Sequence, residues 1–97
     1  MKFMITWVSD SEKRHDVYKT FAQMTDADDE ADRGGVQLIG RWHDVGAGKG
    51  VAICESNDLA AVHSWIFNWN NALDLEITPV VDDDECKAIV KRKLGLG

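Results

Sequence analysis

Proline and cysteine are scarce in this chain: its 97 residues include one proline, Pro79, and two cysteines, Cys54 and Cys86. The two cysteines form neither a CxxC pair nor a disulfide framework, so we expect reduced thiols and a cytoplasmic protein. No apolar run approaches the roughly 20 residues of a membrane span, and a short strand-like segment rather than a signal peptide follows Met1. We therefore expect no membrane partner.

Positive charge is also in short supply. Lysine and arginine together number 11 against 17 acidic residues, which gives a formal net charge of −6. Such a surface repels nucleic acids, and the one basic cluster, residues 91–93, falls at the end of a predicted helix, where cations suit the helix dipole. The sequence therefore predicts no nucleic-acid partner.

Metal-binding patterns are missing as well. The three histidines stand on three different predicted elements, with no HxxxH spacing between them. The acidic stretch Asp26 to Asp32 begins like a calcium loop, but Ala31 stands where that loop needs glycine and Gln37 where it needs glutamate. We interpret the stretch as a solvated acidic loop, and we predict neither a metal nor a cofactor.

Apolar residues, in contrast, are numerous enough for one core. Hydrophobic residues make up 44% of the sequence and charged residues 29%, as in an ordinary globular protein. No linker, repeat or low-complexity tract divides the chain, so residues 1–97 are predicted to form a single domain. Four tryptophans in so short a chain indicate an aromatic core or an aromatic pocket.

Hydrophobic periodicity predicts four strands and three helices. The strands are expected, in chain order, at residues 3–8, 36–44, 51–55 and 73–81. A capping box that begins at Ser9 predicts the first helix, Asn57 or Asp58 caps the second, and the acids at 82–85 open the third. A Gly-rich turn at 46–50 joins the second and third strands into a hairpin.

The resulting order, β-α-β-β-α-β with an added C-terminal helix, is the ferredoxin-like α+β pattern, in which helices cover one face of the sheet. The first strand is apolar on both faces, with Phe3, Ile5 and Trp7 on one side and Met4 and Val8 on the other. A bare face of this mixed character is typical of an interface, and a second copy of the chain is the simplest partner. The residues expected on the bare face are Met4, Val8, Ile39, Ala52 and Cys54, beside Arg41, His43, Glu76 and Thr78.

Four strings of residues add to this pattern. They are Met1-Lys2-Phe3-Met4, Gly40-Arg41-Trp42-His43, the pair Trp65 and Trp69, and Ile77-Thr78-Pro79-Val80 followed by the acids at 82–85. With them the chain resembles, over nearly its whole length, a family of short uncharacterised bacterial proteins in the dimeric α+β barrel superfamily. The resemblance implies a homodimer in which two sheets pack face to face. Because that superfamily includes cofactor-independent monooxygenases, haem-degrading enzymes, isomerases and proteins with no known chemistry, it assigns no activity.

Arg41 and His43 are the candidate polar groups of a site. On a strand they share one face, while Trp42 points to the other. The planar fork of Arg suits a carboxylate or a phosphate, and His can move protons near neutral pH. Two interpretations stay open: a site for an anionic ligand, or structural pairing with Glu76 or Asp74 across a dimer seam.

Strand alternation from Val36 predicts that Trp42 faces the helices and that Arg41 and His43 face the partner sheet, although a β-bulge would reverse this order. In the seam interpretation, a carboxylate partner raises the pKa of His43. The dimer is then expected to lose stability as the pH rises through that pKa.

The tryptophans also have two interpretations, as core residues or as the lining of a pocket between helices and sheet. Asn68 and Asn70 would lie at the mouth of such a pocket. The residues predicted to bind a small-molecule ligand there are Trp7, Trp42, Trp65, Trp69, Arg41 and His43.

The leading prediction is thus a homodimeric small-molecule binding module. One alternative is a monooxygenase-like or isomerase-like enzyme in which His43 is the general base and Arg41 stabilises an oxyanion, the two candidate catalytic residues. The other alternative is a structural or regulatory dimer.

Overall fold

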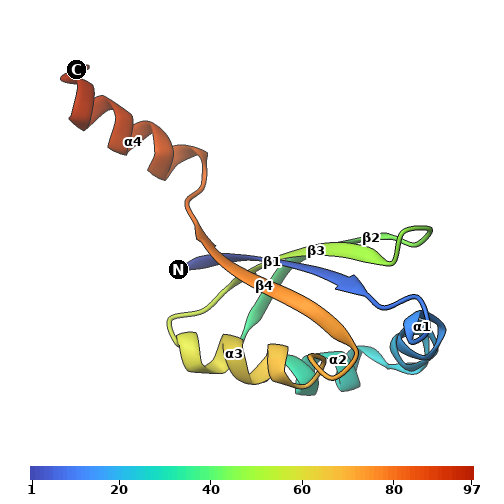
Figure 1. Ribbon diagram of the computed structural model, residues 1–97. Coiled ribbons are helices and arrows are strands. Elements are labelled where there is room, and N and C mark those ends of the chain that lie inside the picture. The colour runs from blue at the N-terminus through green and yellow to red at the C-terminus, as the bar shows by residue number, and fades with distance from the viewer.

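A four-stranded antiparallel sheet, covered on one face by helices, is the frame of the chain in a computed structural model of residues 1–97 (Figure 1). The elements are β1 (Lys2–Ser9), α1 (Arg14–Gln23), α2 (Asp26–Arg33), β2 (Gln37–Asp44), β3 (Lys49–Glu55), α3 (Leu59–Phe67), β4 (Leu73–Val80) and α4 (Asp83–Leu94). The strands lie in the order β2-β3-β1-β4, and every neighbouring pair is antiparallel. This α+β arrangement is compatible with the predicted ferredoxin-like fold. None of the helices combines the length and the apolar character needed to cross a bilayer.

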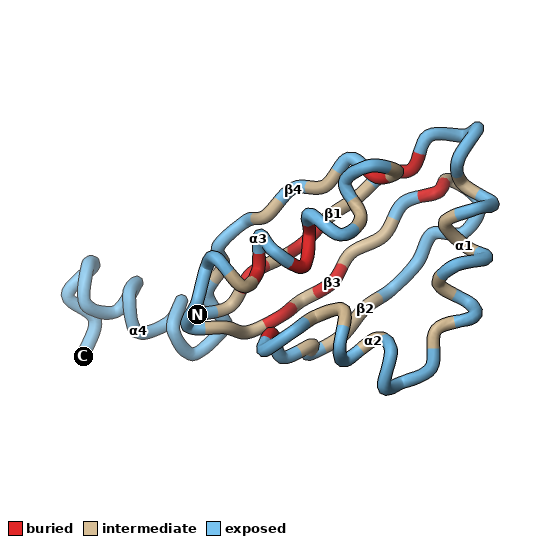
Figure 2. The backbone as a smooth tube through the Cα atoms, turned by 90° about the horizontal axis from the view of Figure 1, so that it is seen from below, coloured by how far each residue is buried: buried red, intermediate tan, exposed pale blue.

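The core lies between the sheet and α3. Phe3 and Ile5 of β1 are each 1% exposed, as their alternation predicts. Asp58 caps α3 by accepting hydrogen bonds from the backbone N–H groups of Ala60 and Ala61. Figure 2 shows the most buried stretches on β1, β3 and α3. The buried cluster consists of Phe3, Ile5, Val36, Ala52, Cys54, Val62, Trp65 and Ile66.

The helix start predicted at Ser9 is wrong. Ser9 ends β1 and is buried, and its hydroxyl donates a hydrogen bond of 3.0 Å to the carbonyl oxygen of Gly48 in the turn between β2 and β3. Its backbone N–H donates to the same carbonyl at 2.8 Å. Because the hydroxyl and the N–H group of Ser9 both donate to this turn, Ser9 does not cap a helix, and α1 begins only at Arg14.

The acidic stretch Asp26 to Asp32 lies in a helix, not in the solvated loop predicted from composition. Thr25 caps α2 by accepting a 3.1 Å hydrogen bond from the backbone N–H of Asp28, whose carboxylate accepts one of 3.0 Å in return from the Thr25 N–H. The hydrogen bonds from Thr25 hold the pKa of Asp28 below its ordinary value. Arg33 in the last turn forms an ion pair with Asp29 one turn earlier.

Strand β2 contains one residue more than its partner strand requires. Leu38 pairs with Cys54, whereas Gly40 pairs with Ile53, the next residue back along β3. Ile39 is therefore left over as a β-bulge, which shifts the alternation of every later residue in the strand by one.

The bulge reverses the predicted facing of three residues. Arg41 and His43 point to the helix-covered face, and Trp42 points to the bare face, where it is 59% exposed. The assignment of Ala52 and Cys54 to the bare face is also wrong, because both are buried at 0% exposure among the core residues. Their neighbours on β3, Val51 and Ile53, take the bare face instead.

Helix α4 stands apart from the rest of the chain. Asp82 and Glu85 form its capping box, as the acids at 82–85 predict, and the ammonium of Lys2 lies 3.4 Å and 3.8 Å from their carboxylates. Every residue from 81 to 97 is exposed. The radius of gyration, 15.9 Å, exceeds the value of about 12.5 Å expected for a compact domain of this length, because α4 leads away from the sheet (Figure 1).

Candidate functional site

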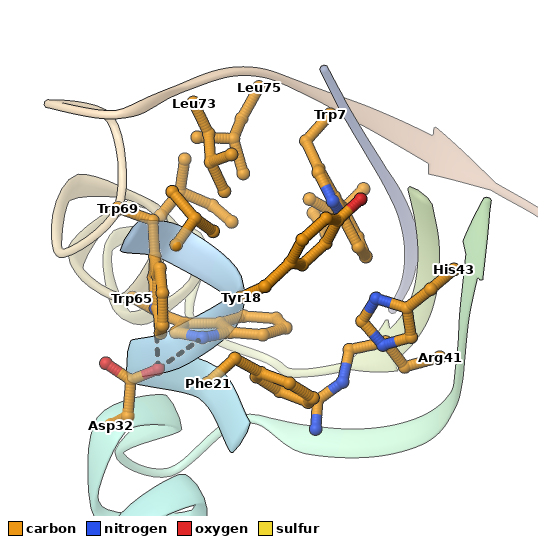
Figure 3. Close-up of a pocket in the computed structure, with 13 residues that line it drawn as sticks. Trp7, Tyr18, Phe21, Asp32, Arg41, His43, Trp65, Trp69, Leu73 and Leu75 are labelled. Carbon is orange, nitrogen blue, oxygen red and sulfur yellow. Dashed lines mark hydrogen bonds between the residues drawn. The ribbon is translucent and has the colours of Figure 1, made fainter. Parts of the chain in front are cut away.

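A pocket lies between the helix-covered face of the sheet and α1, with a cavity volume of about 70 Å³ (Figure 3). Ten of its thirteen lining residues are hydrophobic, so its interior offers contacts mainly to apolar groups. The lining consists of Ile5, Trp7, Val17, Tyr18, Phe21, Asp32, Arg41, His43, Trp65, Ile66, Trp69, Leu73 and Leu75.

Trp7 of β1 forms part of the sheet side of the pocket. It pairs across the ladder with Gly50 of β3, and its indole lies over that glycine. A Cβ atom at position 50 would overlap the indole ring and also approach the backbone oxygen of Trp42. Glycine at this position therefore allows the indole to lie flat on the strand.

Trp65 and Trp69 form the opposite wall, and one carboxylate holds both. Their Nε1–H groups donate hydrogen bonds of 3.1 Å and 2.7 Å to the same oxygen, Oδ2, of Asp32 in α2. The side-chain amide of Asn68 donates to the other oxygen, Oδ1, at 3.0 Å (dashed lines in Figure 3 mark the two indole bonds). Because an indole is rigid and has one donor, Asp32 fixes the orientation of two rings at once.

Arg41 lies at one side of the pocket and is already paired within the chain. Its two terminal nitrogens donate to the two carboxylate oxygens of Asp29 in α2 at 3.1 Å and 2.9 Å. Its guanidinium also lies 4.6 Å from the centre of the Phe21 ring. Burial raises the pKa of Asp29, but hydrogen bonds and charge from Arg41 and Arg33 outweigh this effect, and the pKa lies below its ordinary value.

His43 lies beside Arg41, with its ring between two aromatic side chains. The ring centre is 5.8 Å from that of Trp7 and 5.1 Å from that of Phe21. Burial lowers the pKa of His43 below its ordinary value of 6.5, and the charge of Arg41 lowers it further. Near neutral pH the ring is therefore uncharged, with one nitrogen as donor and the other as acceptor.

These contacts overturn the seam interpretation of the two polar residues. Arg41 pairs with Asp29 of its own chain rather than needing Glu76 or Asp74 of a partner. No carboxylate of the chain contacts His43, and its pKa is lowered rather than raised, so the expected loss of dimer stability in alkali loses its basis.

Helix α1 closes the pocket without burying any of its own residues. Val17, Tyr18 and Phe21 reach down from it into the pocket. The Tyr18 hydroxyl donates a 2.9 Å hydrogen bond to the carbonyl oxygen of Val45, and Arg14 donates to two further carbonyls of the same turn. Side-chain contacts to the turn between β2 and β3 thus hold α1 in place.

Of the six residues predicted to bind a ligand, the structure brings five together. Trp7, Arg41, His43, Trp65 and Trp69 line the pocket. Trp42 does not, since the bulge places its indole over Gly40 on the bare face. Of the two asparagines placed at the mouth, Asn68 contacts Asp32, whereas Asn70 does not line the pocket.

Two residues of the site, Asp29 and Asp32, were not singled out from the sequence. A usable signal was present: Thr25 followed three residues later by Asp28 is close to a capping box, and Asp29 stands four residues before Arg33. Both patterns favour a helix over a loop, and a helix places Asp29 and Asp32 on one side.

Fold and site together define an α+β domain with an aromatic pocket on the helix-covered face of its sheet. The chain belongs to DUF3303, a family described as a domain of unknown function, whose model matches residues 1–94. This confirms the expectation of an uncharacterised family, and the description names no activity. Comparison with curated proteins gave no match.

Proposed function

We propose that the protein is a small-molecule binding module and that its ligand enters the pocket between α1 and the sheet. The observation that carries this proposal is that the walls are pre-organised. Asp32 fixes Trp65 and Trp69, and Gly50 makes room for Trp7. A ligand that enters a pocket whose side chains are already ordered does not have to order them on binding, which lowers the entropic cost.

The polar groups of the pocket define the chemistry of the ligand. The carboxylate of Asp32 is occupied by indole N–H groups, Arg41 by Asp29, and the Tyr18 hydroxyl by a backbone carbonyl. Two polar groups of the lining make no hydrogen bond in the chain, the indole N–H of Trp7 and the ring of His43, and His43 is uncharged near neutral pH. The ligand we propose is therefore apolar at its buried end, with one uncharged hydrogen-bonding group for His43.

The cavity volume limits the size of the buried end. The cavity measures about 70 Å³, whereas an apolar cavity of about 150 Å³ is known to hold benzene. The group that enters the present space is therefore a short or branched alkyl group or the edge of a ring. The rest of the ligand would lie at the mouth beside His43.

Catalysis receives less support than binding. An uncharged His43 suits a general base. No side chain of the protein orients its ring by a hydrogen bond, however, and the Asp29 carboxylate occupies the donors that Arg41 would offer to an oxyanion. We therefore place the monooxygenase-like or isomerase-like enzyme second.

We further propose that the module is a homodimer formed through the bare face of the sheet. That face exposes Trp42 and Val8, which have no covering helix in the chain. Large apolar side chains gathered on one uncovered face are typical of protein interfaces.

The binding proposal is tested by thermal unfolding and tryptophan fluorescence with a panel of small alcohols, amides and phenols. A compound present at about 100 times its Kd adds about 2.7 kcal/mol, which raises Tm by roughly 10–20 °C in a domain of this size. Trp69→Phe should reduce the rise in Tm caused by the compound, because phenylalanine has no N–H group to donate to Asp32. Trp42→Phe is the matched control on the other face and should leave it unchanged. The proposal fails if no compound changes Tm or emission, or if both variants respond alike.

A further inference from the structure

Helix α4 carries all the local signals of a stable helix but has almost no contact with the rest of the chain. A capping box opens it at Asp82, and Gly95, with φ of +65°, closes it in the left-handed conformation. Its only ion pairs with the body of the protein are those of Lys2. A helix of about 12 residues is marginal in water without tertiary packing, so a surface outside the chain is needed to cover it.

One side of α4 is apolar. Cys86, Ile89, Val90 and Leu94 follow helical spacing along it and are all exposed, Leu94 at 69%. Ala88 lies on the opposite side of the helix. The apolar stripe is thus a docking surface without a partner in the chain.

The helix does not cover the sheet of its own chain. Only Val81 and Asp82 separate β4 from α4. The ion pairs of Lys2 with Asp82 and Glu85 lie where the helix leaves the sheet. In Figure 1, α4 extends away from the sheet, on the side opposite to α1, α2 and α3.

The bare face of the sheet is the matching uncovered surface. The paired residues Met4 and Ile53 lie at its centre, and Val51 pairs with Trp42 beside them. Along β1 the face runs from Lys2 to Val8, a distance of about 20 Å. Helix α4 is about 18 Å long, so one helix spans the face from end to end.

The charges of the two surfaces are arranged in a complementary order. Acidic residues gather at the end of the face far from Lys2, where Asp74 pairs with Val8 and Glu76 pairs with Thr6. In α4 the acids stand in the first turn, and the basic residues 91–93 stand in the last. Lys2 is already paired with Glu55, Asp82 and Glu85 of its own chain, so the complementarity rests on the other end of the face. A helix that enters the face at the Lys2 end brings its basic turn to Asp74 and Glu76 there.

We propose that α4 of one copy lies across the bare sheet face of a second copy, and that the second copy places its own α4 on the first by two-fold symmetry. The proposal rests on the homodimer proposed above, but not on the ligand pocket. It names the segment of the partner that covers the sheet, which is a helix rather than a second sheet.

The test is the molar mass of full-length variants in solution at micromolar concentration. The unmodified chain should scatter light as twice its 10.8 kDa mass. Ile89→Glu places a charge in the apolar stripe and should give a monomer. Ala88→Glu adds the same charge on the opposite side of the helix and should remain a dimer. Because α4 does not pack on its own domain, both variants should keep the strand signal in circular dichroism and the cooperative thermal unfolding of the sheet domain.

A change in the sheet separates this arrangement from its rivals. Ile53→Glu at the centre of the bare face should also give a monomer. If Ile53→Glu dissociates the dimer but Ile89→Glu does not, the partner's sheet covers the face and the helix proposal is wrong, while the homodimer stands. If the unmodified chain is a monomer, both are wrong. In either case, ligand-induced changes of Tm remain a separate test of the pocket.

Hydrogen exchange gives an independent measurement. In the proposed dimer the amides of residues 83–94 are protected by the partner, and dilution below the dimer Kd should make them exchange quickly. The amides of α3 should stay protected on dilution, because α3 packs within its own chain. Rapid exchange in α4 while the chain is dimeric would overturn the proposal.

Discussion

The substitution Asp32→Ala tests whether one carboxylate organises the tryptophan wall. Asp32 accepts hydrogen bonds from the Nε1–H groups of Trp65 and Trp69 and from the amide of Asn68. Alanine removes the acceptor for all three. The two indole donors are part-buried and are left without a protein partner.

The expected loss follows from the number of donors. Leaving a buried donor unsatisfied costs about 1–3 kcal/mol, and water at the pocket edge moves each indole to the lower end of that range. Two indoles therefore give a loss of about 2 kcal/mol in the free energy of unfolding. In a domain of this size, this corresponds to a fall in Tm of roughly 8–16 °C.

The assay is thermal unfolding followed by circular dichroism, together with indole emission. Glu30→Ala is the matched control, since it removes the same charge from an exposed position of the same helix and should change Tm little. Asp32→Asn keeps one acceptor oxygen and should lose about half as much stability as Asp32→Ala. If Asp32→Ala unfolds at the same temperature as Glu30→Ala, the carboxylate does not hold the wall, and the reasoning fails.

Three further predictions concern the sheet side of the pocket. Gly50→Ala should lose about 1–3 kcal/mol, because the new methyl overlaps the Trp7 indole, whereas Gly46→Ala, where a Cβ meets nothing closer than 4.0 Å, should unfold like the unmodified chain. Because the pKa of His43 is lowered in the folded state, the unfolded chain binds more protons than the folded chain below pH 6.5. The free energy of unfolding, measured in urea, should therefore fall as the pH drops from 6.5, and His43→Gln should lessen this fall. Deletion of Ile39 should remove the bulge but keep Leu38 paired with Cys54 and Gly40 with Ile53, so His43 should stay on the helix-covered face and its pKa in NMR titration should stay below 6.5.

The elements that local signals specify could be predicted from the sequence. The sequence predicts the positions of strand β1, the Asp58 cap of α3 and the acids that open α4 to within one or two residues. In each case the cap and the hydrophobic pattern favour the same structure, and no distant group competes for the capping side chain.

The failures occur where a contact distant in sequence decides the local structure. Ser9 has the pattern of a helix cap, but the turn that contains Gly48 takes its hydroxyl and its N–H group. The composition of Asp26 to Asp32 favours a solvated loop, yet the cap at Thr25 and the bonds to Arg41, Trp65 and Trp69 make it part of a packed helix. The contact of Ser9 and the bonds to Arg41, Trp65 and Trp69 cannot be seen within a short window of sequence, whereas the cap at Thr25 can.

The bulge at Ile39 and helix α2 have to be considered together, because each makes the other useful to the site. If Ile39 paired with Ile53 and no bulge formed, alternation along β2 would send Arg41 to the bare face, and the Asp29 carboxylate would lose its two hydrogen bonds from Arg41. With the bulge, Arg41 meets Asp29, and Asp32, three residues further along the same helix face, reaches the indoles of the opposite wall. One face of a short acidic helix therefore sets both the polar side of the pocket and its tryptophan wall, and a change in the position of α2 would alter both together.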